Sequence, residues 1–327
     1  MNYAPKAGSL APSKAWVPDH LRPADVQFRF SSAAEAELRA FLGKISLFDP
    51  EALAVAEDAL PAVRSEIEVL RHKVERGCGF VLLDPVTGLH DPEQRRALSW
   101  VIGRLLGEPL AQNEAGDRVV SVYDRDRTKR MRDGARYHQT REGGSLHTDN
   151  VNMLERWDYL MMTCVVPAMT GGESLLVSGL SAYNVLKRNA PEAVDILCED
   201  FWWESRGISD AVFRAPIITF NEWDEPEFRY LRPYLASAHE RAREPLTEAQ
   251  LWAIDTLDSV LEASALQFRH KLDSGQVLVI NDNQMFHGRT SFSDHFDGVT
   301  YGPSLRAQDK RFNRFFDRAW IRALGDG

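Results

Sequence analysis

The segment GGSLHTDN, residues 143–150, places a histidine and an aspartate two positions apart, directly after a pair of glycines. Side chains of a strand alternate between its two faces, so an extended segment would point His147 and Asp149 into one cavity and turn Thr148 away. Imidazole and carboxylate groups are ligands of divalent transition metals. The same pair could also be two polar residues on the solvent-facing side of a sheet.

The His-x-Asp spacing alone is a weak signal, because it recurs at His295 and Asp297 in a stretch typical of a polar loop. Non-haem iron is bound by two histidines and one carboxylate, which leaves three positions for other ligands. Residues 275–292, GQVLVINDNQMFHGRTSF, combine an apolar strand, a polar turn and then His287. A lone histidine here would more often be structural, but together with the first pair it predicts an iron site.

A third element is the late apolar segment RFFDRAWIR, residues 314–322. Because side chains alternate between the two faces of a strand, every second residue shares a face, here Arg314, Phe316, Arg318 and Trp320. An arginine that faces a core needs a carboxylate or a bound anion, because an unpaired buried charge is costly. The sequence leaves two partners open, a buried acidic residue or a dicarboxylic cosubstrate held in a bidentate grip.

The elements that must position these residues differ between the two halves of the chain. The first half predicts a helix over 33–45 after a serine cap, one or two helices over 49–77 interrupted near Pro61, a strand over 79–84 and a helix over 91–107 capped by Asp91. Beyond residue 115, short β-rich runs are separated by turn residues, with helical insertions at 180–197 and 247–265.

This pattern predicts an α+β protein with one catalytic domain over residues 1–327. An extended arm (1–30) and a mainly helical layer (31–110) would brace an antiparallel β core with helical inserts (115–322). The net charge of −9 argues against nucleic-acid and anionic-membrane partners. Three separated cysteines, no apolar segment of membrane-spanning length and no signal-peptide core predict a soluble cytoplasmic protein. A homo-oligomer is neither required nor excluded.

Four segments in this order resemble the TauD/TfdA family of iron(II)- and 2-oxoglutarate-dependent dioxygenases, which includes clavaminate synthase-like members. They are the His147–Thr148–Asp149 motif, TGGESLLVSG, VLVINDNQMFHGRTSF and the closing RFFDRAWIR. The likeness covers roughly residues 75–322. It implies a jelly-roll core, also called a double-stranded β-helix, with Fe(II), 2-oxoglutarate and O2 as cofactor and cosubstrates.

The resemblance also implies roles for individual residues. His147, Asp149 and His287 would bind iron. Arg318, which matches the family's arginine segment best, and Ser174 would hold the distal carboxylate of 2-oxoglutarate. Arg314 is the other arginine of that segment, and the stretch 294–313 makes the spacing from the distal histidine about twice the usual one. Arg289 would be a support residue.

The implied reaction is hydroxylation of an unactivated carbon of a small amino-acid-like or natural-product substrate, with release of succinate and CO2. Desaturation or ring formation is the alternative within the same chemistry. Related halogenases carry Gly or Ala in place of the carboxylate, so Asp149 favours hydroxylation. Predicted substrate-binding residues are Tyr137, Gln139, Asn150, Trp203 and Arg229. The segment 123–144, with six arginines and one lysine, is either a solvated loop or a basic lid.

Two rival functions use the same residues. A zinc hydrolase could bind its metal through the two histidines and the aspartate, but it would give no role to the late arginine or the GGES segment. A jelly roll that binds metal or a small ligand without turnover would be expected to show a broken triad or a lost arginine. Oxygen-dependent formation of succinate distinguishes both from a dioxygenase.

Overall fold

The computed structural model describes residues 14–56, 58–124, 143–205, 209, 211–294 and 313–323. The predicted substrate-binding residues Tyr137 and Gln139 lie outside this range, as do His295 and Asp297. Within the described residues, no helix is both long and apolar enough to cross a lipid bilayer. The three cysteines are free, in agreement with the absence of a disulfide framework.

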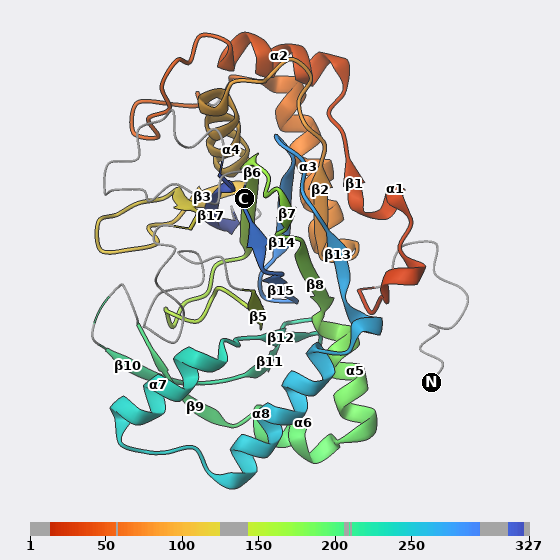
Figure 1. Cartoon of the computed structure of the whole chain (residues 1–327), viewed down its shortest axis with the longest axis vertical. Coiled ribbons are helices and arrows are strands. Elements are labelled where there is room, and N and C mark those ends of the chain that lie inside the picture. Colours follow the sequence, from red (N-terminus) through yellow and green to blue (C-terminus); the bar gives the residue numbers. More distant parts are fainter. Residues whose placement is uncertain are drawn as a thin grey trace.

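Three helices form the expected layer near the N-terminus: α2 (Ser32–Leu42), α3 (Pro61–Arg76) and α4 (Pro92–Leu106). Side-chain caps fix two of their starts, because Ser31 accepts a hydrogen bond from the Ala34 amide and Asp91 accepts from Glu93 and Gln94. Their apolar faces pack on one face of the larger sheet (Figure 1). The helix expected over 49–60 is wrong: the described residues there form turns, and α3 starts only at the proline.

The larger sheet has seven strands in the order β1-β2-β14-β6-β17-β3, with β4 also paired to β17. All pairs are antiparallel except β1 with β2. The runs expected as strands at 79–84, in YLMMTCVV, in GQVLVIND and in RFFDRAWI are confirmed. The bounds are β1 Gln27–Phe28, β2 Phe80–Leu83, β3 Gly107–Pro109, β4 Val120–Val122, β6 Tyr159–Val166, β14 Val277–Asn281 and β17 Phe315–Ala323.

The smaller sheet faces the larger one and has the order β13-β8-β15-β5. Leu176 of β8, Met285 of β15, Leu278 of β14 and Phe316 of β17 belong to one buried cluster, so the two sheets share a core. This sandwich of antiparallel strands confirms the expected α+β jelly roll. The bounds are β5 Gly144–His147, β8 Ser174–Ser178, β13 Phe268–His270 and β15 Met285–Arg289, with a short pair β7 Thr170–Gly171 and β16 Phe292–Ser293 beside them.

A large insertion between β8 and β13 forms the lower half of Figure 1. The two helical inserts expected from the sequence are confirmed, whereas α7 was not predicted. The insertion has its own apolar core, which includes Trp203, Phe228 and Leu257. Its elements are α5 Gly179–Asn189, α6 Pro191–Leu197, β9 Asp200–Glu204, β10 Val212–Pro216, β11 Ile218–Phe220, β12 Pro226–Phe228, α7 Arg232–Ala242 and α8 Glu248–Leu261; near the N-terminus α1 spans Pro23–Val26.

Candidate metal centre and cosubstrate pocket

The two predicted histidines lie on neighbouring strands of the smaller sheet. His147 ends β5 and pairs in register with His287 of β15, and their ring centroids are 4.3 Å apart. Asp149 lies two residues beyond the end of β5, so the expectation that the histidine and the aspartate share one strand is wrong. Thr148 still turns away, because its hydroxyl donates to Asn150 and accepts from the Tyr230 amide. One nitrogen or oxygen atom from each of His147, Asp149 and His287 lies within 4.8 Å of the others.

The two oxygens of the Asp149 carboxylate have different partners. Oδ1 is 3.5 Å from His147 Nε2 and 3.8 Å from His287 Nε2. Oδ2 accepts hydrogen bonds of 2.8 Å from both Arg318 Nη1 and Trp320 Nε1. Burial alone would raise the pKa of Asp149, but the nearby Arg318 charge, followed by the effect of the two histidines, outweighs it and holds the pKa well below its ordinary value. The carboxylate is therefore ionised, with one oxygen facing the histidines.

The hydrogen bond of His147 leaves its Nε2 free to bind a metal. His147 Nδ1 is 2.7 Å from the Ser145 carbonyl oxygen, which can only accept, so Nδ1 carries the proton. Burial, followed by the nearby His147, lowers the pKa of His287 to about 3, so this ring is neutral. Two imidazole nitrogens and one carboxylate oxygen on one side of a cavity match the donor set of a non-haem iron site.

A cavity of about 120 Å³ opens beside the three side chains. Apolar residues from both sheets form much of its wall, and the polar part includes Ser174, Arg289, Arg314 and Arg318. Leu231 and Tyr234 bring the start of α7 to the same cavity. The remaining lining residues are Val122, Gly144, Met162, Leu176, Leu278, Ile280 and Gly288.

Ser174, Arg289 and Arg314 form one cluster in this wall, which we call the two-arginine cluster. Ser174 and Arg289 are direct partners across β8 and β15, and both guanidinium groups lie against the Phe292 ring, at 4.7 and 5.1 Å from its centroid. Burial and the charge of Arg289 lower the pKa of Arg314 to about 9, and its Nε has no hydrogen-bond partner in the described part of the chain. A buried guanidinium with an unpartnered Nε, beside a second, partly buried guanidinium in the same cavity wall, favours an anionic ligand.

Arg318 is placed differently from the expectation that it grips the cosubstrate. It lines the cavity, but its Nη1 donates to Asp149 and its Nε donates to Gln112 Oε1 at 2.8 Å. Its partner is thus a buried acidic residue, which was the structural alternative left open by the sequence. Parity was right that both arginines of the closing segment face the cavity, but it could not indicate which one is already paired.

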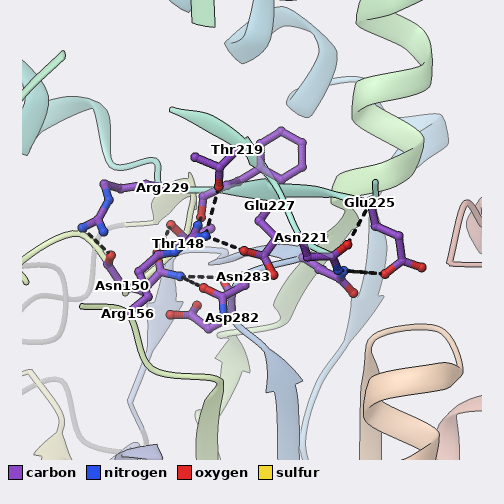
Figure 2. A network of polar contacts seen from close by, with 12 residues as sticks. Thr148, Asn150, Arg156, Thr219, Asn221, Glu225, Glu227, Arg229, Asp282 and Asn283 are labelled. Atoms are coloured by element: carbon purple, nitrogen blue, oxygen red, sulfur yellow. Dashed lines mark hydrogen bonds and ion pairs between the residues drawn. The ribbon is translucent and has the colours of Figure 1, made fainter. Parts of the chain in front are cut away.

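A polar network lies behind the metal centre, on the side of the insertion (Figure 2). Asn150 donates to Asn283 Oδ1 at 2.5 Å and to the Asp282 carbonyl oxygen at 3.3 Å. Arg229 donates to the carbonyl oxygens of Asn150, Met153 and Leu154. Figure 2 also shows Arg156 paired with Glu227. These contacts fix the loop that follows the His-x-Asp motif.

Three predicted substrate-binding residues are corrected by this geometry, because none of them is among the described residues that line the cavity. Asn150 and Arg229 are buried in the network, where the guanidinium stabilises carbonyl groups rather than facing a ligand. Trp203 is fully buried in the core of the insertion, and its Nε1 donates to the Ala215 carbonyl oxygen. The neighbouring Trp202 points away from this core, and its Nε1 donates to Glu244.

Sequence reasoning missed Gln112, Asp282 and the role of Trp320. Gln112 carried no signal, because it lies in a loop far from every motif. Asp282 belongs to the polar turn that was recognised between the apolar strand and His287, so its position could have been noticed. Its carboxylate is fully buried beside the metal centre. Trp320 was placed on the right face of the strand but was given no function.

The family model for the taurine catabolism dioxygenase TauD, TfdA family matches residues 49–300. The chain belongs to this family. The match covers most of the chain and confirms both the resemblance inferred from the motifs and the expected class of enzyme, a 2-oxoglutarate-dependent non-haem iron dioxygenase.

Several similar proteins share only a low sequence identity with this chain. The chain is 27% identical over 234 residues to FR-33289 synthase from Streptomyces rubellomurinus, covering 70% of this chain and 67% of that protein. An asparagine oxygenase solved with Fe(II), 3-hydroxyasparagine and succinate is similar over 90% of this chain and 93% of its own, with 19% identity and a TM-score of 0.66. The non-heme iron oxygenase OrfP, solved with iron and alpha-ketoglutaric acid, is similar over 91% and 94%, with 19% identity and a TM-score of 0.60. The structural likenesses support the jelly-roll fold.

Proposed function

We propose that this protein hydroxylates a free amino acid or a closely related small molecule, with 2-oxoglutarate as cosubstrate. The observation that carries the proposal is the convergence of two imidazole nitrogens and one carboxylate oxygen beside a buried two-arginine cluster in one cavity. Iron held by these residues would supply the oxidative chemistry that couples the conversion of 2-oxoglutarate and O2 into succinate and CO2 to hydroxylation of the substrate.

Three atoms would hold the iron: His147 Nε2, Asp149 Oδ1 and His287 Nε2. Arg318 and Trp320 both donate hydrogen bonds to Asp149 Oδ2. The carboxylate can therefore offer only its other oxygen, Oδ1, to the metal. A carboxylate bound through one oxygen leaves more of the metal surface open than one bound through both. This supports a site with three free positions, which a keto acid and oxygen together require.

Arg314, rather than Arg318, would hold the distal carboxylate of 2-oxoglutarate. Its guanidinium lines the cavity with an unpartnered Nε, whereas Arg318 is already bonded to Asp149 and Gln112. Ser174, as proposed from the sequence, would assist, and the adjacent Arg289 would add positive charge. A dicarboxylate bound there would offset the cost of burying two cations and would be positioned before oxygen arrives.

The proposal of an amino-acid-like substrate is supported by the solved relatives. One similar structure is an asparagine oxygenase in complex with 3-hydroxyasparagine and succinate, and another is OrfP in complex with succinate and a hydroxylated arginine. The intact Asp149 carboxylate favours hydroxylation over halogenation. We also propose a cytoplasmic location for the protein, because iron(II) and free thiols are both stable under reducing conditions.

The test is an incubation of iron-loaded protein with 2-oxoglutarate, O2 and each of the twenty L-amino acids, followed by mass spectrometry. The proposal predicts that at least one amino acid gains one oxygen atom in step with succinate formation. Succinate without any oxygenated amino acid would contradict the substrate class but keep the enzyme class. Absence of succinate from iron-loaded, folded protein under every condition would contradict the cosubstrate assignment itself.

A further inference from the structure

Asp282 lies in the turn between β14 and β15 and is fully buried, although it belongs to neither the metal-binding set nor the two-arginine cluster. A buried carboxylate is costly unless it is paired or hydrogen-bonded. The place of Asp282 in the fold is therefore maintained by its contacts, and these contacts lead to the metal centre.

Two proposed metal-binding residues meet Asp282 on the same oxygen. Oδ1 accepts a hydrogen bond of 3.1 Å from the backbone amide of Asp149 and is 3.6 Å from His287 Nδ1. That Nδ1 is buried and makes no hydrogen bond within the described part of the chain. A shift of roughly half an ångström would bring the ring nitrogen into hydrogen-bond range of the carboxylate.

The second oxygen of Asp282 is anchored by a tryptophan pair. Trp157 Nε1 donates to Asp282 Oδ2 at 2.9 Å, and Trp320 Nε1 donates to Asp149 Oδ2. The two indole rings are stacked, with centroids 4.1 Å apart and planes at 13°. One stacked pair therefore holds both carboxylates, and so fixes the position of Asp282 relative to Asp149.

The two histidines differ in what orients them. His147 Nδ1 donates to a neutral backbone carbonyl, whereas His287 Nδ1 faces the carboxylate of Asp282 at 3.6 Å. A metal on Nε2 leaves the ring proton on Nδ1, and a carboxylate that accepts this proton fixes the ring and makes it a better electron donor.

We propose that Asp282 is a positioning residue that orients His287 through Nδ1 and holds the backbone of Asp149, so that both present their ligand atoms to the metal. This inference rests on the proposed function for the identity of the metal site. Asp282, in the turn between β14 and β15, would thus raise the affinity for the metal without being one of its three ligands.

The test compares metal binding by wild-type protein with three variants, by calorimetric titration of the metal-free protein with Co(II). Asp282→Ala removes the acceptor, and we expect about 10- to 100-fold weaker binding. Asp282→Asn keeps an oxygen for the Asp149 amide and His287 but no charge, so we expect a smaller, several-fold loss. Asp158→Asn is the matched control, because this partly buried carboxylate accepts from the Ala323 amide and contacts no ligand residue; its affinity should equal that of wild type.

A second readout separates positioning from general stability. Nitrogen-15 spectra of the histidine rings in metal-free protein should show the His287 proton on Nδ1 in wild type and its redistribution to Nε2 in Asp282→Ala. Unchanged Co(II) affinity and an unchanged tautomer in folded Asp282→Asn and Asp282→Ala would overturn the proposal, as would an equal loss in the Asp158 control. If wild type binds Co(II) but forms no succinate with iron, the proposed function fails while this inference stands.

Discussion

At the scale of single residues, the carboxylate of Asp149 connects the metal centre to the stability of the core. One oxygen faces the two histidines, and the other neutralises the Arg318 guanidinium, which is only 14% exposed. Removing the aspartate therefore has two separate consequences, the loss of a metal ligand and the creation of an unpaired buried cation. These consequences can be separated by substitution.

Asp149→Ala should abolish hydroxylation and destabilise the metal-free protein by about 3 kcal/mol, because breaking a buried ion pair from one side leaves the other charge uncompensated. The double variant Asp149→Ala/Arg318→Met should recover most of the stability but none of the activity. Urea unfolding and succinate formation measure the two effects independently. Equal stability of the single variant and wild type would show that the ion pair does not contribute as described.

Individual site residues could be predicted from the sequence where residue type alone restricts the chemistry. His147, Asp149 and His287 were found because few arrangements of imidazole and carboxylate have another use, and Arg314 and Arg318 were both found because an arginine facing a core needs an anion. The choice between the two arginines could not be made. It depends on where Asp149 lies in space, and that position is set by a different sheet.

At the scale of secondary-structure elements, the short pair β7–β16 packs beside the two-arginine cluster. Gly171 of β7 has a φ of +64°, and a Cβ atom there would lie 2.1 Å from the Ser291 carbonyl oxygen. A Cβ atom added at the next residue, Gly172, would lie 3.5 Å from Arg314 Nε. The glycines of the TGGES segment thus allow the chain at β7 to approach Ser291 and Arg314 closely.

Gly171→Ala should lower the free energy of unfolding by about 3 kcal/mol, of which about 1–2 kcal/mol comes from the left-handed backbone and the rest from the clash. Gly116→Ala is the matched control, since its φ is +80° but no atom lies within 4 Å of the added Cβ. The control should lose only the backbone contribution, as measured by urea unfolding. Equal losses in both variants would contradict the close approach.

Elements were predictable where a local signal fixed them. Asp91 and the proline after it defined the start of α4, and continuous apolar runs defined β6 and β14. The segment before Pro61 has helical composition but forms turns, because the proline begins a new helix there. The start of α7 was missed because its position depends on packing against β9 and on the cavity, which local sequence does not reveal.

At the scale of the whole molecule, the insertion between β8 and β13 places α7 against both the cavity and a small sheet. His239 on α7 is buried, with Nε2 accepting from the Trp202 amide and Nδ1 facing the Glu244 carbonyl oxygen. Burial lowers the pKa of His239, although the contact with Glu244 opposes the shift and the Arg214 charge adds to it. Protonation would break the bond to the amide, so folding favours the neutral ring.

A histidine with a folded pKa below its unfolded value of about 6.5 contributes stability that is present above that pH and is lost as the pH falls. Wild-type metal-free protein should therefore lose stability between about pH 7.5 and 5.5, and His239→Gln should lose less over the same interval. The contribution of His287 is common to both proteins and cancels in the comparison. Parallel stability curves for the two proteins would contradict this description of the interface between α7 and β9.

The overall architecture could be predicted from the order of the expected elements. A helical first half followed by short strands beyond residue 115 is compatible with few ways of packing helices and sheets. The shared core of the two sheets and the site between them are consistent with that prediction. The two small sheets of the insertion could not be predicted from the sequence, because their strands are short and pair only with each other.

The most direct test is a titration of anaerobic protein with Fe(II) and 2-oxoglutarate, followed by the visible charge-transfer band that the chelated keto acid gives. Wild type should develop the band. Arg314→Ala should need about 10- to 100-fold more 2-oxoglutarate, as expected for losing a charge-assisted hydrogen bond, while Arg318→Ala, which removes a partner of Asp149, should chiefly need more iron and lose less 2-oxoglutarate affinity than Arg314→Ala. No band in wild type, or a loss of 2-oxoglutarate affinity confined to Arg318→Ala, would contradict the site described for this protein.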